Sequence, residues 1–153
     1  MSRRTRGVVA CAAVVLLATG CSHGPPEIDA PDLSAADAAT CRDFVNALPE
    51  TLGGHEPAAT TGDTVYGAAW GDPAIVLTCG VGPVDLTEVP PCTVVNGVGW
   101  VVQETDGRTT LTADGYRPRV RLVVPDDYEQ PAGLVTGLAP LVKKYLRLEE
   151  RCL

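Results

Sequence analysis

The sequence predicts an α+β domain in which an antiparallel sheet of short strands carries an N-terminal and a C-terminal helix on one face. Three observations predict this fold. Near both ends of the chain, apolar residues recur at intervals of three and four, which is typical of amphipathic helices. Between them, short β-type runs are separated by turn residues at the close intervals of antiparallel hairpins. Because each helix has one apolar stripe and the sheet has one apolar face, we expect a two-layer sandwich.

Residues 1–20 have the layout of a bacterial lipoprotein signal peptide. A basic head with three arginines precedes an uncharged apolar run that is too short to span a bilayer. Gly20 then precedes Cys21, as in a lipobox, whose cysteine is diacylated and becomes the first residue of the mature protein. An ordinary secretory signal is the alternative. We expect palmitate-type acyl chains on Cys21 to hold an exported protein at the outer face of the cytoplasmic membrane.

The expected organisation is a signal peptide over residues 1–20, a flexible tether over 21–33 and a single α+β domain over 34–153. The tether is rich in proline, glycine and acids. Residues 1–20 contain three of the arginines and no acid, so the remaining chain has nine basic and 19 acidic side chains, a formal net charge of −10. This charge disfavours binding to nucleic acid, because such binding depends on basic side chains.

The N-terminal helix is expected to begin at Ser34, whose hydroxyl can cap free backbone amides while Asp37 lies in the first turn. Its apolar stripe includes Cys41, and Leu48-Pro49 is expected to end it. Because capping explains Ser34, we do not assign this residue a role as a nucleophile. At the other end, apolar residues predict a C-terminal helix that is kinked or restarted at Pro140.

Between the helices we expect a meander of antiparallel hairpins. Gly71-Asp72-Pro73 marks the first turn and Asn96-Gly97 marks a second. Asp-Gly pairs mark the two turns that follow. The expected strands are Thr64–Trp70, Ala74–Cys79, Cys92–Val95, Trp100–Glu104, Arg108–Ala113 and Tyr116–Val124.

Arginines alternate with apolar residues in the last of these strands. The period of two places Arg117, Arg119 and Arg121 on one face, which we expect to point outward. A solvated outer face that balances acidic neighbours is one interpretation. An anion-recognising stripe is the other, since guanidinium groups suit carboxylates and phosphates. Pro118 predicts an edge strand or a bulge.

Four cysteines remain once residues 1–20 are removed and Cys21 is lipidated. They are Cys41, Cys79, Cys92 and Cys152, and an even number in an exported chain indicates two disulfides. A metal site or a thiol nucleophile is the alternative, but the chain contains no CxxC pair. We therefore expect no metal and no cofactor. From the residues alone, three pairings of these cysteines are open.

Several short pieces of the sequence form a recognisable combination: Cys41 with Leu48-Pro49, Ala69–Gly71, Ile75–Leu77 with Cys79–Val81, Asn96–Val98 with Trp100, and Val120–Pro125. Together they resemble a family of small exported actinobacterial lipoproteins of unknown function. The resemblance covers most of the chain after the tether, and it implies a Cys41–Cys79 disulfide that leaves Cys92 with Cys152. A Cys79–Cys92 bridge across the intervening loop is the alternative that geometry suggests. The resemblance implies no activity and no catalytic residues.

Three classes of function are weighed. The first is a non-catalytic binding or accessory module with an envelope protein partner, because no nucleophile–base pair, phosphate loop or metal spacing is found. The second is a receptor for a sugar, a lipid or an anionic envelope component. The third, a hydrolase, would need facing acids, and consecutive acids are usually solvated. The receptor would use Trp70, Trp100, Tyr116 and the three arginines, and the hydrolase Asp126/Asp127 or Glu149/Glu150.

Overall fold

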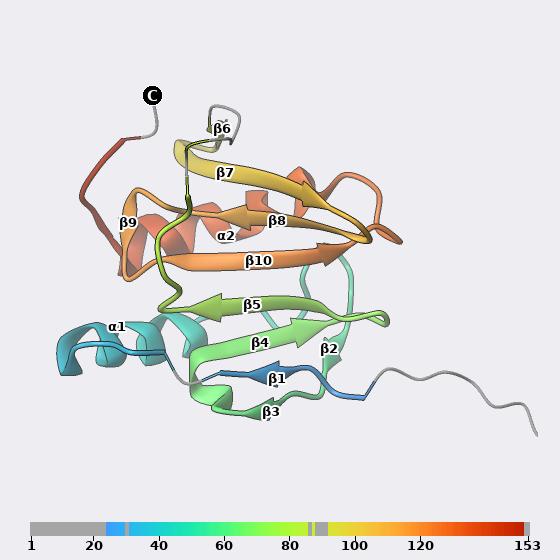
Figure 1. Ribbon diagram of the computed structural model, residues 1–153. Coiled ribbons are helices and arrows are strands. Elements are labelled where there is room, and N and C mark those ends of the chain that lie inside the picture. Colours follow the sequence, from blue (N-terminus) through green and yellow to red (C-terminus); the bar gives the residue numbers. More distant parts are fainter. Residues whose placement is uncertain (1–23, 30, 86, 88–91, 152–153) are drawn as a thin grey trace, which may run out of the picture.

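A seven-stranded antiparallel sheet forms the centre of the molecule (Figure 1). The computed structural model describes residues 24–29, 31–85, 87 and 92–151. The strand order is β2-β4-β5-β10-β8-β7-β6, and the sheet is not closed into a barrel. Its strands are β2 (Pro57–Ala58), β4 (Gly67–Trp70), β5 (Ile75–Cys79), β6 (Thr93–Val95), β7 (Val98–Thr105), β8 (Arg108–Thr112) and β10 (Val120–Pro125).

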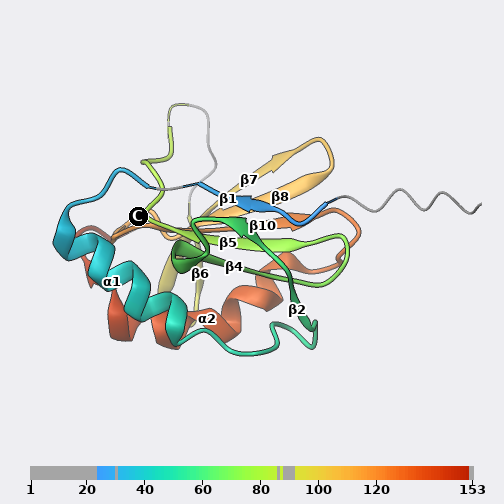
Figure 2. The ribbon, with the colours of Figure 1, turned by 90° about the horizontal axis from the view of Figure 1, so that it is seen from below.

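Two helices accompany the sheet, which confirms the predicted mixture of helices and antiparallel strands. They are α1 (Ala35–Asn46) and α2 (Pro131–Tyr145), and Figure 2 shows both on the same side of the sheet. The rings of Phe44 and Tyr145 meet edge to face, with their centroids 6.5 Å apart. α2 runs through Pro140 as one helix, so the expected restart there is not found.

The capping predicted for the N-terminal helix is confirmed. Ser34 precedes α1, and its Oγ accepts a hydrogen bond of 3.1 Å from the backbone amide of Asp37. The hydroxyl also donates to the Asp37 carboxylate at 2.9 Å. This arrangement satisfies one of the amides that the first helical turn leaves free. The role of Ser34 in the fold is therefore that of a cap.

A disulfide joins α1 to the sheet. Cys41 on α1 and Cys79 at the end of β5 are bonded, with their Cα atoms 5.6 Å apart, and both side chains are fully buried. This confirms the Cys41–Cys79 pairing and excludes the Cys79–Cys92 alternative. Cys92 is also disulfide-bonded. Its expected partner, Cys152, lies outside the described residues.

The strand order differs from a simple meander. The hairpins predicted at Gly71-Asp72-Pro73 and at Asn96-Gly97 are present as β4–β5 and β6–β7. However, β10 lies between β5 and β8, so the last long strand of the sheet joins the first hairpin to the second group of strands. The side chains of Val120 and Leu122 on β10 are completely buried, which places this strand in the middle of the core.

The expected strand Tyr116–Val124 is interrupted at Pro118, which has no amide hydrogen to donate to a neighbouring strand. Its first part is β9 (Tyr116–Arg117), which pairs with β11 (Arg147–Leu148) in a separate two-stranded sheet. Its second part, β10, is a central strand, so the edge position predicted from Pro118 is wrong for it. The beginning of another expected strand also differs, since Thr64–Tyr66 forms a 3-10 turn, η1.

Part of the expected tether is packed against the domain. β1 (Glu27–Ile28) pairs in parallel with β3 (Thr61–Gly62), and the side chain of Ile28 is buried. A Cβ added at Gly67 would approach the Ile28 side chain to 2.9 Å, and one added at Gly80 would approach Leu33 and Pro31 to 2.7–2.8 Å. Glycine at these two positions therefore leaves room for the segment. We call residues 26–29 and 31–33 the strap; their packing differs from the flexible tether expected over 21–33.

Candidate functional site

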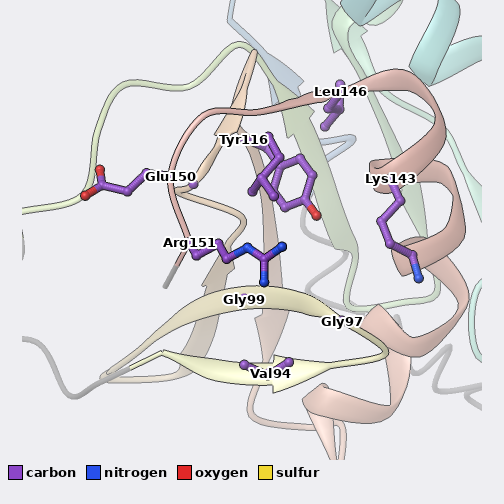
Figure 3. A pocket seen from close by; sticks show the side chains of 10 residues that line it. Val94, Gly97, Gly99, Tyr116, Lys143, Leu146, Glu150 and Arg151 are labelled. Carbon is purple, nitrogen blue, oxygen red and sulfur yellow. The ribbon is translucent and has the colours of Figure 1, made fainter. Parts of the chain in front are cut away.

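A groove of about 550 Å³ lies between the β6–β7 hairpin, the C-terminal end of α2 and the last described residues of the chain (Figure 3). We call it the hairpin groove. Its lining combines apolar side chains, exposed glycine backbone and charged groups from segments far apart in the sequence. The residues that matter for its chemistry are Val94, Gly99, Tyr116, Lys143, Leu148 and Arg151.

The hairpin wall of the groove is set by its turn and by contacts with α2. Asn96 and Gly97 both have positive φ angles, 49° and 80°, as a tight two-residue hairpin turn requires. The Lys143 ammonium donates a 2.9 Å hydrogen bond to the carbonyl of Asn96, and the Asn96 side-chain amide donates at 3.4 Å to the carbonyl of Thr136. The hairpin is therefore held to α2 at its tip.

The opposite wall is the C-terminal segment, which is bonded to the turn before β9. The carbonyl of Gly115 accepts hydrogen bonds from the amides of Glu149 and Glu150, at 3.0 and 3.2 Å. A Cβ at position 115 would overlap the carbonyl oxygen of Glu150, so this close approach requires glycine. The Glu149 carboxylate also pairs with Arg147 at 2.6 Å and with Arg117 at 3.3 Å.

The chemistry of the groove is apolar with a local positive charge. Val94 is 64% exposed and Leu148 45% exposed, and both are large apolar side chains that line the groove. Figure 3 shows the guanidinium of Arg151 directed toward the hairpin near Gly99, while the carboxylate of Glu150 points away. A group with an apolar part and an anionic part would satisfy both kinds of lining.

Acidification is expected to loosen the C-terminal wall. The hydrogen bond from Arg147, supported by the charge of Arg117, lowers the pKa of Glu149 below its ordinary value of 4.5. Because the folded-state pKa is the lower one, the stabilisation is present above the ordinary value and is lost as the pH falls through the folded value. Hydrogen exchange of the Glu149 and Glu150 amides, measured from about pH 6 to about pH 3, should show lost protection.

The matched control for this titration is Glu149→Gln, which cannot titrate. Its protection at Glu150 should be low already near neutral pH and should not change further on acidification. If the native chain keeps full protection at the lowest pH, the ion pairs of Glu149 do not hold the segment in place.

The two tryptophans that were candidate contacts belong to the core instead. Trp70 and Trp100 are 2% and 1% exposed, and neither lines the hairpin groove. The Trp70 indole N–H donates to the carbonyl of Glu50 at 3.1 Å, whereas the Trp100 N–H has no partner among the described residues. Tyr116, the third aromatic candidate, does line the groove, although most of its side chain is buried.

The three arginines do not form one open stripe. Arg119 pairs with Asp114 at 2.7 Å, and the two side chains are only 15% and 18% exposed. Arg117 pairs with Glu149, and Arg121 donates to the Thr112 hydroxyl at 3.4 Å. The guanidinium groups are therefore engaged within the protein, which favours the interpretation that they balance neighbouring groups of the fold.

Sequence reasoning missed Lys143, Arg151, Val94 and Leu148 as lining residues. The Asn96-Gly97 turn was a usable signal, since it predicts the hairpin that forms one wall. No local pattern predicts that the C-terminal segment would return to that hairpin.

Two further properties concern only the part of the chain that the structure describes. It contains no group of three or more His, Cys, Asp or Glu side chains arranged to hold a metal ion. None of its helices has both the length and the apolar character needed to cross a bilayer. Cys21, the expected lipidation site, lies outside the described residues.

Comparison with known proteins places the chain in a family. No curated protein and no solved structure matches it. Residues 5–150 match the model of a family described as "Protein of unknown function (DUF3515)", which agrees with the expected resemblance to a family of unknown function. Because this match spans nearly the whole sequence, the chain belongs to the DUF3515 family.

Proposed function

We propose that this chain is an exported lipoprotein, as in the actinobacterial family that it resembles, and that it acts as a non-catalytic binding module of the cell envelope. A lipid on Cys21 holds it at the outer face of the cytoplasmic membrane, and its two-layer α+β domain binds a partner protein in the hairpin groove. The observation that carries the proposal is the groove itself, which combines exposed apolar side chains with the cation of Arg151. Signal-peptide features of residues 1–20 support the location.

The position of the groove suits contact with a neighbouring protein. In both Figure 1 and Figure 2, the start of β1 and the C-terminal segment lie at opposite ends of the molecule. The hairpin groove is lined by that C-terminal segment, so it lies far from the side where the chain leads back toward Cys21. A partner protein can therefore reach the groove while the N-terminal side remains at the membrane.

The recognised segment should carry an apolar residue and a carboxylate. Val94 and Leu148 offer apolar contact, and the planar guanidinium of Arg151 can hold a carboxylate through two hydrogen bonds. The domain as a whole is acidic and repels an acidic partner. The positive charge of Arg151 attracts such a partner, so it directs the approach to the groove.

Site-specific photo-crosslinking in cells tests this proposal. A photoreactive residue at position 94 should give one discrete protein adduct, and Arg151→Glu should reduce its yield several-fold. Position 65 is the matched control, because Val65 is also a large apolar side chain and is 50% exposed, but does not line the groove. Equal adducts from positions 94 and 65, or an adduct indifferent to Arg151→Glu, would contradict the proposal.

A small anionic amphiphile is the second candidate, and the presence of both Lys143 and Arg151 in the lining favours it. Its apolar part would contact Leu148 and its charged group the two cations. Amide chemical shifts of Gly97 and Gly99, followed while envelope lipids and muropeptides are added, test it. Saturable shifts at both glycines, without a protein adduct at position 94, would favour the small ligand.

A further inference from the structure

The described chain begins beside a second hollow, at the opposite end of the molecule from the hairpin groove. This hollow has a volume of about 570 Å³ and is lined in part by Gly24, Pro25 and Pro26. The strap fixes the position of this segment, because the amide of Thr61 donates to the carbonyl of Pro26 at 3.0 Å and the amide of Asp63 donates to the carbonyl of Ile28 at 2.8 Å. We call this second site the strap hollow.

The chain between Cys21 and the strap hollow is very short. Cys21 precedes Gly24 by three residues. A fully extended chain spans at most about 3.6 Å per residue, so the Cα atoms of these residues are separated by at most about 11 Å. This limit holds for any conformation of the intervening residues. A lipid on Cys21 therefore begins close to the strap hollow.

The lining of the strap hollow is suited to a bilayer with neutral headgroups. Of the described residues that line it, only Asp72 is charged. The others are glycine, alanine, valine and proline, including Ala59, Ala74 and Val76. The chain after residue 20 has a formal net charge of −10, whereas this lining presents little charge.

We infer that the membrane lies against the strap hollow, so that the domain is anchored in one orientation with the hairpin groove directed away from the bilayer. The inference rests on the proposed lipidation of Cys21. The short connection to the lipid is what fixes the orientation. Because the strap is docked, the segment between the lipid and the domain is too short to let the domain rotate freely above the membrane. A flexible tether over residues 21–33 would impose no orientation.

Depth-dependent fluorescence quenching tests the orientation. The mature protein, purified from cells that produce the full chain, is placed in phosphatidylcholine vesicles with a single dye at Ala59→Cys or at Val94→Cys. Both side chains are exposed, and they line the strap hollow and the hairpin groove respectively. A quencher attached to the lipid headgroup should quench the dye at position 59 several-fold more than the dye at position 94. Equal quenching, or stronger quenching at position 94, would overturn the inference.

An insertion tests whether the short segment between Cys21 and the domain causes the orientation. Ten glycine and serine residues placed after Gly24 should make quenching at the two positions nearly equal, because a flexible segment of that length reaches about 18 Å on average. An unchanged difference would contradict the tether as the cause. Flotation with the vesicles distinguishes the two proposals: protein that does not float refutes the lipid anchor and the orientation together, while floating protein without a difference refutes the orientation alone.

Discussion

Replacing both Cys41 and Cys79 with alanine is expected to lower the free energy of unfolding by about 3–4 kcal/mol. The disulfide closes a loop with a sequence separation of 38 residues. Without it, the unfolded chain gains conformational entropy and is stabilised relative to the folded state. Both side chains are completely buried, so the smaller alanines also leave unfilled space between α1 and β5. Chemical denaturation of the folded domain measures the change.

The double variant is preferable to either single one, because a lone buried thiol could form a non-native disulfide. Asp43→Ala is a suitable control, since Asp43 lies on the exposed side of α1. It should change stability by less than about 0.5 kcal/mol. If the free energy of unfolding falls by less than about 1 kcal/mol in the double variant, the disulfide does not reduce the conformational entropy of the unfolded chain as loop closure predicts.

Replacing Asp114 with alanine is expected to cost about 2–3 kcal/mol. Its carboxylate accepts a 2.7 Å hydrogen bond from Arg119 and a 3.2 Å hydrogen bond from the amide of Val84. The Arg119 side chain is only 15% exposed, so its loss of a partner leaves a largely buried guanidinium uncompensated. Thermal or chemical unfolding of the purified domain would measure the cost.

The chain contains a matched control for Asp114. Asp106 also stands before a glycine in a turn between strands, but it is exposed. Asp106→Ala should therefore change stability by less than about 0.5 kcal/mol. Adding Arg119→Leu to Asp114→Ala should recover part of the loss, because it removes the unpaired charge. Equal costs at Asp114 and Asp106 would show that the ion pair does not stabilise the fold.

Local chemistry made much of this fold predictable. The cap at Ser34, the turn at Asn96-Gly97 and the turn at Gly71-Asp72-Pro73 each depend on residues that are adjacent in the sequence. The structure contains each of them. The Cys41–Cys79 bridge came from a resemblance and not from spacing, because spacing alone left three pairings open.

The rest depends on contacts between distant segments. A strict period of two runs from Arg117 to Arg121, so the pattern predicts one strand, although the chain divides at Pro118 into strands of two different sheets. The insertion of β10 beside β5 has no local signal. The hairpin groove likewise needs three segments, around residues 94–99, 115–116 and 143–151, to meet in space. Sequence patterns describe each segment but not their meeting.

Because β10 lies between β5 and β8, the first hairpin keeps an open edge until the last strand of the sheet has formed. Ile75–Cys79 precedes its partner Val120–Val123 by more than 40 residues in the chain. Until then the backbone edge of β5 has no neighbour on one side, and such an edge can pair with another chain. Pairing of β10 with β5 is thus what shields the first hairpin from self-association, and a truncated product ending before Val120 would aggregate.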